Sequence, residues 1–105
     1  MADRTIRFHE FGGPEVLRFE SLDAGDPGQG ELRVRIEAIG LNRAEASFRS
    51  GRYVEKAQLP SRIGYEAAGI VEASGPGVQG FAPGDPVCIL PTFSMTRYGV
   101  YAERT

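Results

Sequence analysis

The chain has 105 residues, 41% of them hydrophobic, and this size supports one domain with a single modest core. A net charge of −2 argues against a nucleic-acid-binding protein, and one cysteine and one histidine exclude an internal disulfide and a cysteine-rich zinc site. No apolar run is long enough for a signal peptide or a membrane span, which predicts a soluble protein of the cytoplasm.

The first third of the chain predicts short strands separated by turns. Residues 5–8 and 16–22 are strand candidates joined by a glycine-rich turn at 11–15, and residues 23–30 predict a loop. The clearest pattern follows at 32–38, where apolar and charged side chains alternate: Leu32, Val34, Ile36 and Ala38 against Arg33, Arg35 and Glu37. This alternation predicts a strand with one face buried and one in water.

One short helix is predicted after this strand. Asn42 is a typical N-cap, and Glu45 can reach back to the Asn42 amide. The helix is expected to end near Ser50, because Gly51 stops it. Residues 52–61 then predict an irregular loop.

The remaining apolar runs are short and are separated by glycine and proline. They predict strands at 67–73, buried on both faces, at 86–90 and at 98–102. Fourteen glycines and seven prolines lie between such runs without a period. Many short strands with one small helix predict a mainly β fold, an irregular antiparallel β-barrel.

The run from Gly75 to Gly80 spells G-x-G-x-x-G, a pattern that can bind a dinucleotide when a helix follows it. Pro83 and Gly84 prevent that helix from forming here. The run is therefore predicted to be a surface turn that touches no phosphate.

Other candidate site residues have a structural alternative. His9 and Cys88 lie too far apart and have too few partners for a metal site, so both are predicted to be structural, with Cys88 a small buried hydrophobe. Glu66 opens a buried strand and is either an active-site carboxylate or, as chemistry favours, half of a structural ion pair. Asn42 is a helix cap, a ligand contact or both, since capping leaves its NH2 free to donate.

Several segments recur in an order that resembles a known superfamily. They are FGGPEVL at 11–17, GLNR at 40–43, GRY at 51–53, GYEAAGIV at 64–71, GPGV at 75–78, GDPV at 84–87 and GVYAE at 99–103. This ordered set is similar to the N-terminal part of the medium-chain dehydrogenase/reductase superfamily. The first two segments look most like its quinone oxidoreductase branch.

The resemblance implies that residues 1–105 form a GroES-like β-barrel, the substrate-binding (catalytic) domain of an enzyme that uses NAD(P)H. In the superfamily a Rossmann domain follows this region and the chain then returns to finish the barrel. The sequence stops at Thr105, before either, so a fragment, an excised domain or a natural truncation is expected. The zinc-dependent members carry a cysteine near the position of Asn42 and a His-Glu pair where this chain has Tyr65-Glu66. The cysteine and the histidine are missing, which implies a zinc-free protein.

The resemblance also implies roles for particular residues. Asn42, Arg43 and Ser47 are expected to line the cofactor and substrate cleft, and Tyr53 to lie at its mouth as the best candidate for a catalytic acid. Glu66 is expected to brace the barrel.

Two functions remain open at this stage. One is a zinc-independent, NADPH-dependent reductase of quinones, activated enones or carbonyls, with a small-molecule substrate, a homodimer as its assembly, and no nucleic acid or membrane partner. The other is a non-enzymatic GroES-like module that acts by oligomerisation or partner binding. The residues do not discriminate NADPH from NADH, because the cofactor domain reads that difference.

Overall fold

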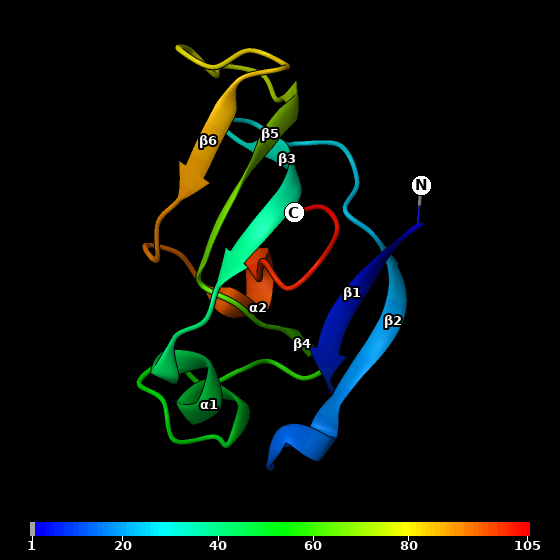
Figure 1. Cartoon of the computed structure of the whole chain (residues 1–105), viewed down its shortest axis with the longest axis vertical. Helices are drawn as coiled ribbons and strands as arrows, with labels where there is room; N and C mark the ends of the chain where they lie inside the picture. Colours follow the sequence, from blue (N-terminus) through cyan, green and yellow to red (C-terminus); the bar gives the residue numbers. More distant parts are fainter. Residues whose placement is uncertain (1) are drawn as a thin grey trace.

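The computed structural model describes residues 2–105; Met1, the first residue of the predicted domain, lies outside the described residues. Two three-stranded antiparallel sheets form the framework of the molecule (Figure 1). The first sheet has the order β2-β1-β4, with β1 Ala2–Phe8, β2 Leu17–Asp23 and β4 Ser61–Arg62. The second has the order β3-β5-β6, with β3 Leu32–Gly40, β5 Glu66–Ser74 and β6 Pro86–Ile89. The helical elements are the 3-10 turn η1 Pro14–Val16, α1 Arg43–Arg49 and α2 Met95–Tyr98. No helix within residues 2–105 has the length and apolar character needed to cross a membrane.

The predicted N-terminal hairpin is confirmed. Strand β1 pairs with β2 in continuous register from Ala2 opposite Asp23 to Phe8 opposite Leu17. The glycine-rich turn contains η1, whose first residue is Pro14, a position that proline favours because its missing N–H has no helical partner. Phe8, at the end of β1, is fully buried in the core.

The alternation in β3 holds only for its first half. Val34 is buried and Ile36 half-buried, while Arg35 and Glu37 are exposed. The register against β5 shifts between Arg33 and Val34 and again between Ile36 and Ala38, and Ala38 after the second shift is exposed.

Strand β5 also differs from its prediction. It buries Ala67, Gly69 and Val71 on one face, whereas Ala68 and Ile70 on the other face are half-buried. Its sheet packs on the core with one face only, so the expectation of burial on both faces is wrong.

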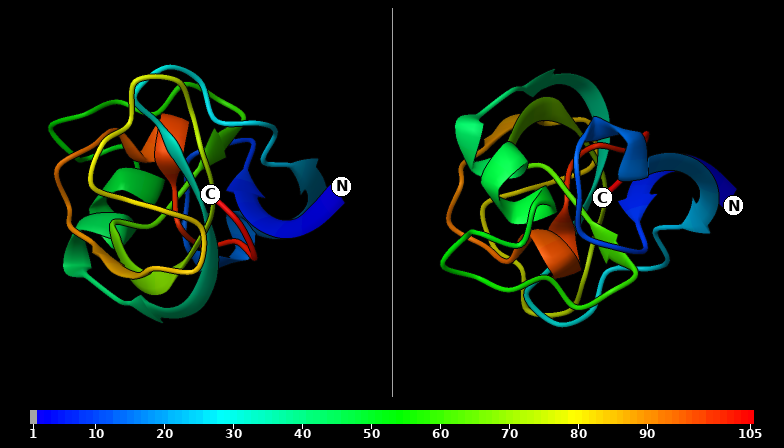
Figure 2. Two further views of the ribbon diagram at one scale, coloured as in Figure 1. Left: turned by 90° about the horizontal axis from the view of Figure 1, so that it is seen from above. Right: turned by 90° about the horizontal axis from the view of Figure 1, so that it is seen from below.

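The segment after α2, residues 99–105, is called here the C-terminal segment; it lies between β1 and β3 (Figure 1). On one side the Ile6 amide donates to the carbonyl of Tyr101 at 2.8 Å. On the other side Val34 and Thr105 exchange two backbone hydrogen bonds, at 2.9 and 3.1 Å. Views from above and below show β1 and β2 on one side of this segment and the second sheet on the other (Figure 2). The C-terminal segment therefore connects the two sheets into one barrel-like fold.

The prediction of a strand at 98–102 is wrong in its bounds, and so is that of a single helix. Tyr98 ends the helix α2, and the next residues pair through isolated bridges, Thr5 with Ala102 and Arg35 with Arg104. The helix forms because Tyr98 donates its amide to the Ser94 carbonyl at 2.9 Å, a local bond that an extended chain cannot make.

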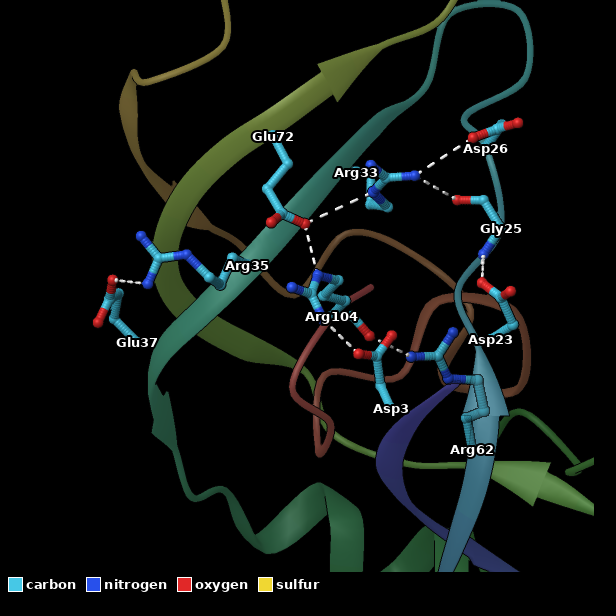
Figure 3. Close-up of polar contacts among 10 residues, drawn as sticks. All are labelled: Asp3, Asp23, Gly25, Asp26, Arg33, Arg35, Glu37, Arg62, Glu72 and Arg104. Carbon is cyan, nitrogen blue, oxygen red and sulfur yellow. Dashed lines mark hydrogen bonds and ion pairs between the residues drawn. The ribbon is translucent and has the colours of Figure 1, made fainter. Parts of the chain in front are cut away.

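Charged side chains also join the C-terminal segment to both sheets (Figure 3). Arg104 of the C-terminal segment bonds Asp3 of β1 and, at 2.6 Å, Glu72 of β5. Asp3 is only 3% exposed, and the Glu72 carboxylate also lies 3.5 Å from Arg33 of β3. The hydrogen bond from Arg104 lowers the pKa of Glu72 below its ordinary value of 4.5, against the opposing effect of burial.

The glycine run forms a turn, as predicted, and no helix starts within it or directly after it. The Gly75 amide donates to the Glu31 carbonyl at 2.8 Å, so it is already satisfied within the protein. A Cβ at Gly75 would lie 1.7 Å from the Gly28 carbonyl oxygen, so the close approach of two loops requires this glycine. The turn is at the opposite end of the molecule from α1 (Figure 1).

Cys88 and His9 are both on the surface. Cys88 is exposed, so its prediction as a buried hydrophobe is wrong: in β6 the half-buried side chains are Val87 and Ile89, and Cys88 points the other way. His9 is exposed and pairs with Glu20 of β2.

Replacing Arg104 by Met should lower the free energy of unfolding at pH 7 by about 3 kcal/mol, because the buried Asp3 loses its counter-charge. Arg4→Met is the matched control, since the Arg4–Glu103 pair is 77% and 47% exposed and should contribute less than about 1 kcal/mol. Urea unfolding followed by circular dichroism measures both.

The Arg104–Glu72 pair should make the stability of the fold depend on pH in the acid range. A lowered pKa of Glu72 in the folded state means that its stabilisation is complete above pH 4.5 and is lost as the pH falls further. Arg104→Met should flatten this loss. Equal effects of the Arg104 and Arg4 substitutions would contradict the role given to Arg104.

Candidate functional site

Helix α1 begins as the sequence predicts. Asn42 has extended backbone angles, φ −129° and ψ 150°, and forms a capping box with Glu45. The backbone amide of Asn42 donates to the Glu45 carboxylate at 3.0 Å. Gly51 follows the helix with φ +80°, a conformation that favours glycine. These local signals fix where Asn42 and the residues after it lie.

The Asn42 side chain is held by Glu66. Its Nδ2 donates to Glu66 Oε1 at 3.0 Å, across 24 residues of sequence. Glu66 lies opposite Gly40 in the β3–β5 ladder, and a Cβ at Gly40 would be 2.5 Å from Glu66 Cγ. The glutamate side chain therefore lies across Gly40 to reach Asn42. The expected ion pair is wrong: within residues 2–105 Glu66 forms no salt bridge, and its polar partner is a neutral amide.

Glu45 has a second role that the sequence analysis missed. Glu45 is 4% exposed, and its Oε1 also accepts a hydrogen bond from the Tyr101 hydroxyl at 2.9 Å. Burial, and after it this hydrogen bond, raises the pKa of Tyr101. Oε2 is buried and has no hydrogen-bond partner among the described residues. A signal was present, because Glu45 and Phe48 are three apart on α1 and so share the face that Phe48 buries.

Tyr53 belongs to a continuous series of aromatic contacts. Its ring meets Phe48 at 6.3 Å and Tyr65 at 5.9 Å between centroids, both edge-to-face. Its loop is tied to the start of α2 by Glu55, which accepts hydrogen bonds from the Ser94 hydroxyl and, at 3.3 Å, from the Met95 amide. Tyr53 is half-buried, so one part of the ring packs and another part stays accessible.

Arg43 and Ser47 lie one turn apart on α1, a spacing that places them on the same side of the helix. Arg43 is exposed and forms no salt bridge within residues 2–105. The Ser47 hydroxyl, on a half-buried residue, makes no hydrogen bond to another described residue, although the Ser47 carbonyl accepts the Arg52 amide at 2.9 Å. Both side chains are therefore free to meet a ligand.

Of the five predicted site residues, the structure joins only Asn42 and Glu66 to each other, Tyr53 contacts a residue that was not predicted, and the side chains of Arg43 and Ser47 belong to neither contact. Glu66 holds Asn42, and Tyr65, the residue before Glu66, contacts Tyr53. The sequence analysis gave Tyr65 no role.

The family model of the alcohol dehydrogenase GroES-like domain matches residues 28–103. The chain belongs to this family. It is 42% identical over 101 residues to the quinone oxidoreductase of Rattus norvegicus, covering 95% of this chain and 30% of that protein.

Two solved structures agree. The Escherichia coli quinone oxidoreductase complexed with NADPH matches with a TM-score of 0.84 and 38% identity, over 96% of this chain and 30% of that one. The human synaptic vesicle membrane protein VAT-1 homolog-like protein matches with a TM-score of 0.89 and 33% identity, over 100% of this chain and 32% of that one. These matches confirm the GroES-like domain and the resemblance to the quinone oxidoreductase type. The chain spans about a third of the length of each of these relatives.

Of the three side chains that the family resemblance places at zinc-ligand positions, only Glu66 is of a type that binds zinc. Zinc sites in proteins use cysteine, histidine and carboxylate ligands. Here the three side chains are the amide of Asn42, the phenol of Tyr65 and the carboxylate of Glu66. Glu66 Oε1 already accepts a hydrogen bond from the side-chain N–H of Asn42. Within residues 2–105 no three His, Cys, Asp or Glu side chains lie close enough together to hold a metal ion.

Replacing Asn42 by Asp should lower the free energy of unfolding by about 1 kcal/mol at pH 7, because it places a second carboxylate beside Glu66. Like charges raise the pKa of the carboxylate pair in the folded state, so the lost stability should return on acidification. Thermal unfolding between pH 4 and pH 8 measures this.

Glu66→Gln in the Asn42→Asp background should restore stability, since the new amide can donate to the new carboxylate in the reverse direction. Strictly additive losses from the two substitutions would show that the two side chains are not coupled.

Proposed function

We propose that this chain is the substrate-binding domain of a zinc-independent, NADPH-dependent oxidoreductase that reduces quinones or activated enones and carbonyls. The similarity to a quinone oxidoreductase complexed with NADPH, over nearly the whole chain, is the observation that carries the proposal. The proposal includes a small-molecule substrate, a homodimer as the assembly, a cytoplasmic location, and no nucleic acid or membrane partner.

The accessible groups on and beside α1 fit a phosphate-bearing cofactor rich in hydroxyl groups. Asn42 has two amide N–H donors, and Glu66 uses one of them. Arg43 offers an exposed cation without an acidic partner among the described residues, and Ser47 offers a free hydroxyl. In this proposal these three residues hold the cofactor, which supplies the hydride when it is bound.

Tyr53 is proposed as the residue that supplies the proton. Its phenol can donate to the substrate oxygen that gains negative charge during reduction, and water can then return the proton to Tyr53. Its ring is fixed between Phe48 and Tyr65, so the hydroxyl is held in one orientation without an entropic loss at the moment of reaction. Glu66 would act indirectly, by orienting Asn42.

A protein that carries this chain as its N-terminal domain should oxidise NADPH in the presence of a quinone, and Tyr53→Phe should lower kcat/KM about a hundredfold. Tyr98→Phe is the matched control, because Tyr98 is paired with Glu31 and does not contact Tyr53. Absorbance at the nicotinamide band follows the reaction.

The 105-residue chain by itself should give no turnover above a protein-free control, because hydride transfer needs the nicotinamide and its acceptor held in close contact. Quinone reduction that is unaffected by Tyr53→Phe would contradict the role of Tyr53. Absence of any reduction by the longer protein would contradict the proposed function.

Zinc independence can be measured directly. Protein purified without added metal should contain well under one equivalent of zinc, because the donor set of Asn42, Tyr65 and Glu66 does not match the ion. Elemental analysis before and after dialysis against a chelator is the measurement. One equivalent that resists the chelator would overturn this part of the proposal.

A further inference from the structure

Strand β2 has the one long strand edge that residues 2–105 leave uncovered. It is seven residues long and is the outer strand of its sheet, with no strand beside its outer edge (Figure 1). The other outer strands differ. The C-terminal segment bonds to β3, β4 has only two residues, and β6 has four and begins with Pro86, which lacks an N–H. An uncovered edge as long as that of β2 can pair with a strand of another chain.

The direction of the outer backbone groups of β2 follows from its partner β1. The Arg4 carbonyl and the Ile6 amide of β1 bond to the C-terminal segment, so the alternate residues of β1 direct their N–H and C=O groups toward β2. Those residues lie opposite the even-numbered residues of β2. Because backbone groups alternate in direction along a strand, the odd-numbered residues of β2 direct theirs outward. An incoming strand would therefore hydrogen-bond to Phe19 and its odd-numbered neighbours.

Phe19, in the middle of this edge, is an exposed aromatic side chain. It is 75% exposed, although its strand is paired on the inner side. Phe19 also lines a groove together with Ile6, Ile39 and Tyr101, so its ring is part of an apolar patch. Covering the ring would remove apolar area from water, which favours association through this edge.

Arg18, next to Phe19, has a charge that its own chain does not neutralise. It is exposed and forms no salt bridge within residues 2–105. Across the hairpin it lies opposite Arg7, a like charge, which is an unfavourable pairing. Glu20, two residues along the same face, bonds to Arg7 at 2.7 Å and to His9 at 2.5 Å. An acidic side chain on an incoming strand would give Arg18 the partner that it lacks.

A two-fold axis at Phe19 lets a second copy of the chain meet these requirements. Opposite side chains of an antiparallel pair share a face, so a two-fold axis between two β2 strands passes at a residue position. With the axis at Phe19, this residue forms a hydrogen-bonded pair with Phe19 of the second copy. Arg18 then lies opposite Glu20 of the second copy as a non-hydrogen-bonded pair, the kind in which side chains approach most closely.

The neighbouring positions of the axis are worse. An axis at Glu20 places two Glu20 carboxylates opposite each other, and an axis at Arg18 does the same with two guanidinium groups. An axis at Ser21 places Phe19 opposite the charged Asp23. Only the axis at Phe19 pairs apolar with apolar and positive with negative.

We propose that β2 is a homodimer interface, in which two copies pair antiparallel with Phe19 on the two-fold axis and Arg18 beside Glu20 of the second copy. The two sheets then form one six-stranded sheet. This inference rests on the homodimer of the proposed function and names its interface. The strand pair is small, so association is reversible and depends on protein concentration. Its ion pairs are accessible to solvent, so added salt weakens the dimer.

The first test is sedimentation velocity of the 105-residue chain between about 10 µM and about 1 mM. The wild type should change from monomer to dimer over this range. Arg18→Glu should raise the dissociation constant about tenfold or more, because two attractive pairs become repulsive. Arg52→Glu is the matched control, since Arg52 is also exposed and forms no salt bridge within residues 2–105, and it should match the wild type. A wild type that stays monomeric, or equal effects of the two substitutions, would overturn the inference.

A charge exchange tests the pairing itself. Glu20→Lys alone should also weaken association, because it places a second cation opposite Arg18. An equimolar mixture of Arg18→Glu and Glu20→Lys should associate as the wild type does, since each opposite pair again has unlike charges. Circular dichroism checks that Glu20→Lys stays folded without its bond to Arg7. Two folded variants that do not associate in the mixture would contradict the pairing.

Disulfide trapping tests the register and does not depend on Glu20→Lys. In a Cys88→Ser background, Phe19→Cys places a thiol on the axis, where the two Cα atoms are about 5.5 Å apart and a disulfide can form. Ser21→Cys is the control, because its two copies would be about 13 Å apart along the strands. With diamide as the oxidant, Phe19→Cys should give a covalent dimer on a non-reducing gel and Ser21→Cys should not. Equal yields would overturn the register.

The outcomes separate the two proposals. A longer protein that stays fully dimeric with Arg18→Glu would keep the proposed homodimer and overturn this interface. A protein that dimerises through β2 but reduces no quinone would overturn the proposed function and leave the interface standing, because association needs neither cofactor nor substrate.

Discussion

The fold depends on one short extended segment with a partner on each side. Residues 99–105 hydrogen-bond through their backbone to β1 on one side and to β3 on the other, and no direct ladder joins those two strands. Without this segment two strand edges would lack backbone partners: that of β3, which ends its sheet, and that of β1 before its two pairs with β4. The C-terminal segment covers both edges at once, and Arg104 adds ionic contacts to β1 and β5 from the same position.

The same segment reaches the candidate site through Tyr101. The Tyr101 hydroxyl donates to the buried carboxylate of Glu45, which in turn accepts the backbone amide of Asn42. The position of α1, and of the accessible Asn42 at its start, therefore depends on residues more than 50 positions away. Burying a polar group costs free energy that hydrogen bonds offset, so the two bonds to Glu45 Oε1 link the stability of this end of the fold to the geometry of the site.

The site combines groups that satisfy one another with groups that remain free. Glu66 uses one N–H of Asn42 and Glu45 holds its backbone, while Arg43 and Ser47 have no polar side-chain partner among the described residues. Aromatic contacts surround Tyr53 and Tyr65 on several sides and restrict their rotation. Such an arrangement is suited to holding a ligand in one orientation, because the supporting shell is ordered before the ligand arrives.

The sequence by itself determined what depends on neighbours along the chain. Turn residues between apolar runs placed the N-terminal hairpin, the Asn42–Glu45 capping box started α1, and Gly51 with its positive φ ended it. Proline and glycine after Gly80 correctly excluded a helix, and with it a dinucleotide fingerprint. These features follow from backbone conformations that single residues permit or forbid, so they can be inferred without a three-dimensional fold.

The tertiary structure decided what depends on residues distant in sequence. Period-two alternation could not reveal the register shift after Ile36, and an apolar run could not show that Cys88 faces outward. The partner of Glu66 is 24 residues away, and Tyr101, the second partner of the Glu45 carboxylate, is 56 residues away, so neither of these two pairs has a local signal. A side chain's burial and hydrogen-bond partner are set by which distant segments pack against it. That packing is why Tyr65, to which the sequence analysis gave no role, contacts both Tyr53 and Phe93.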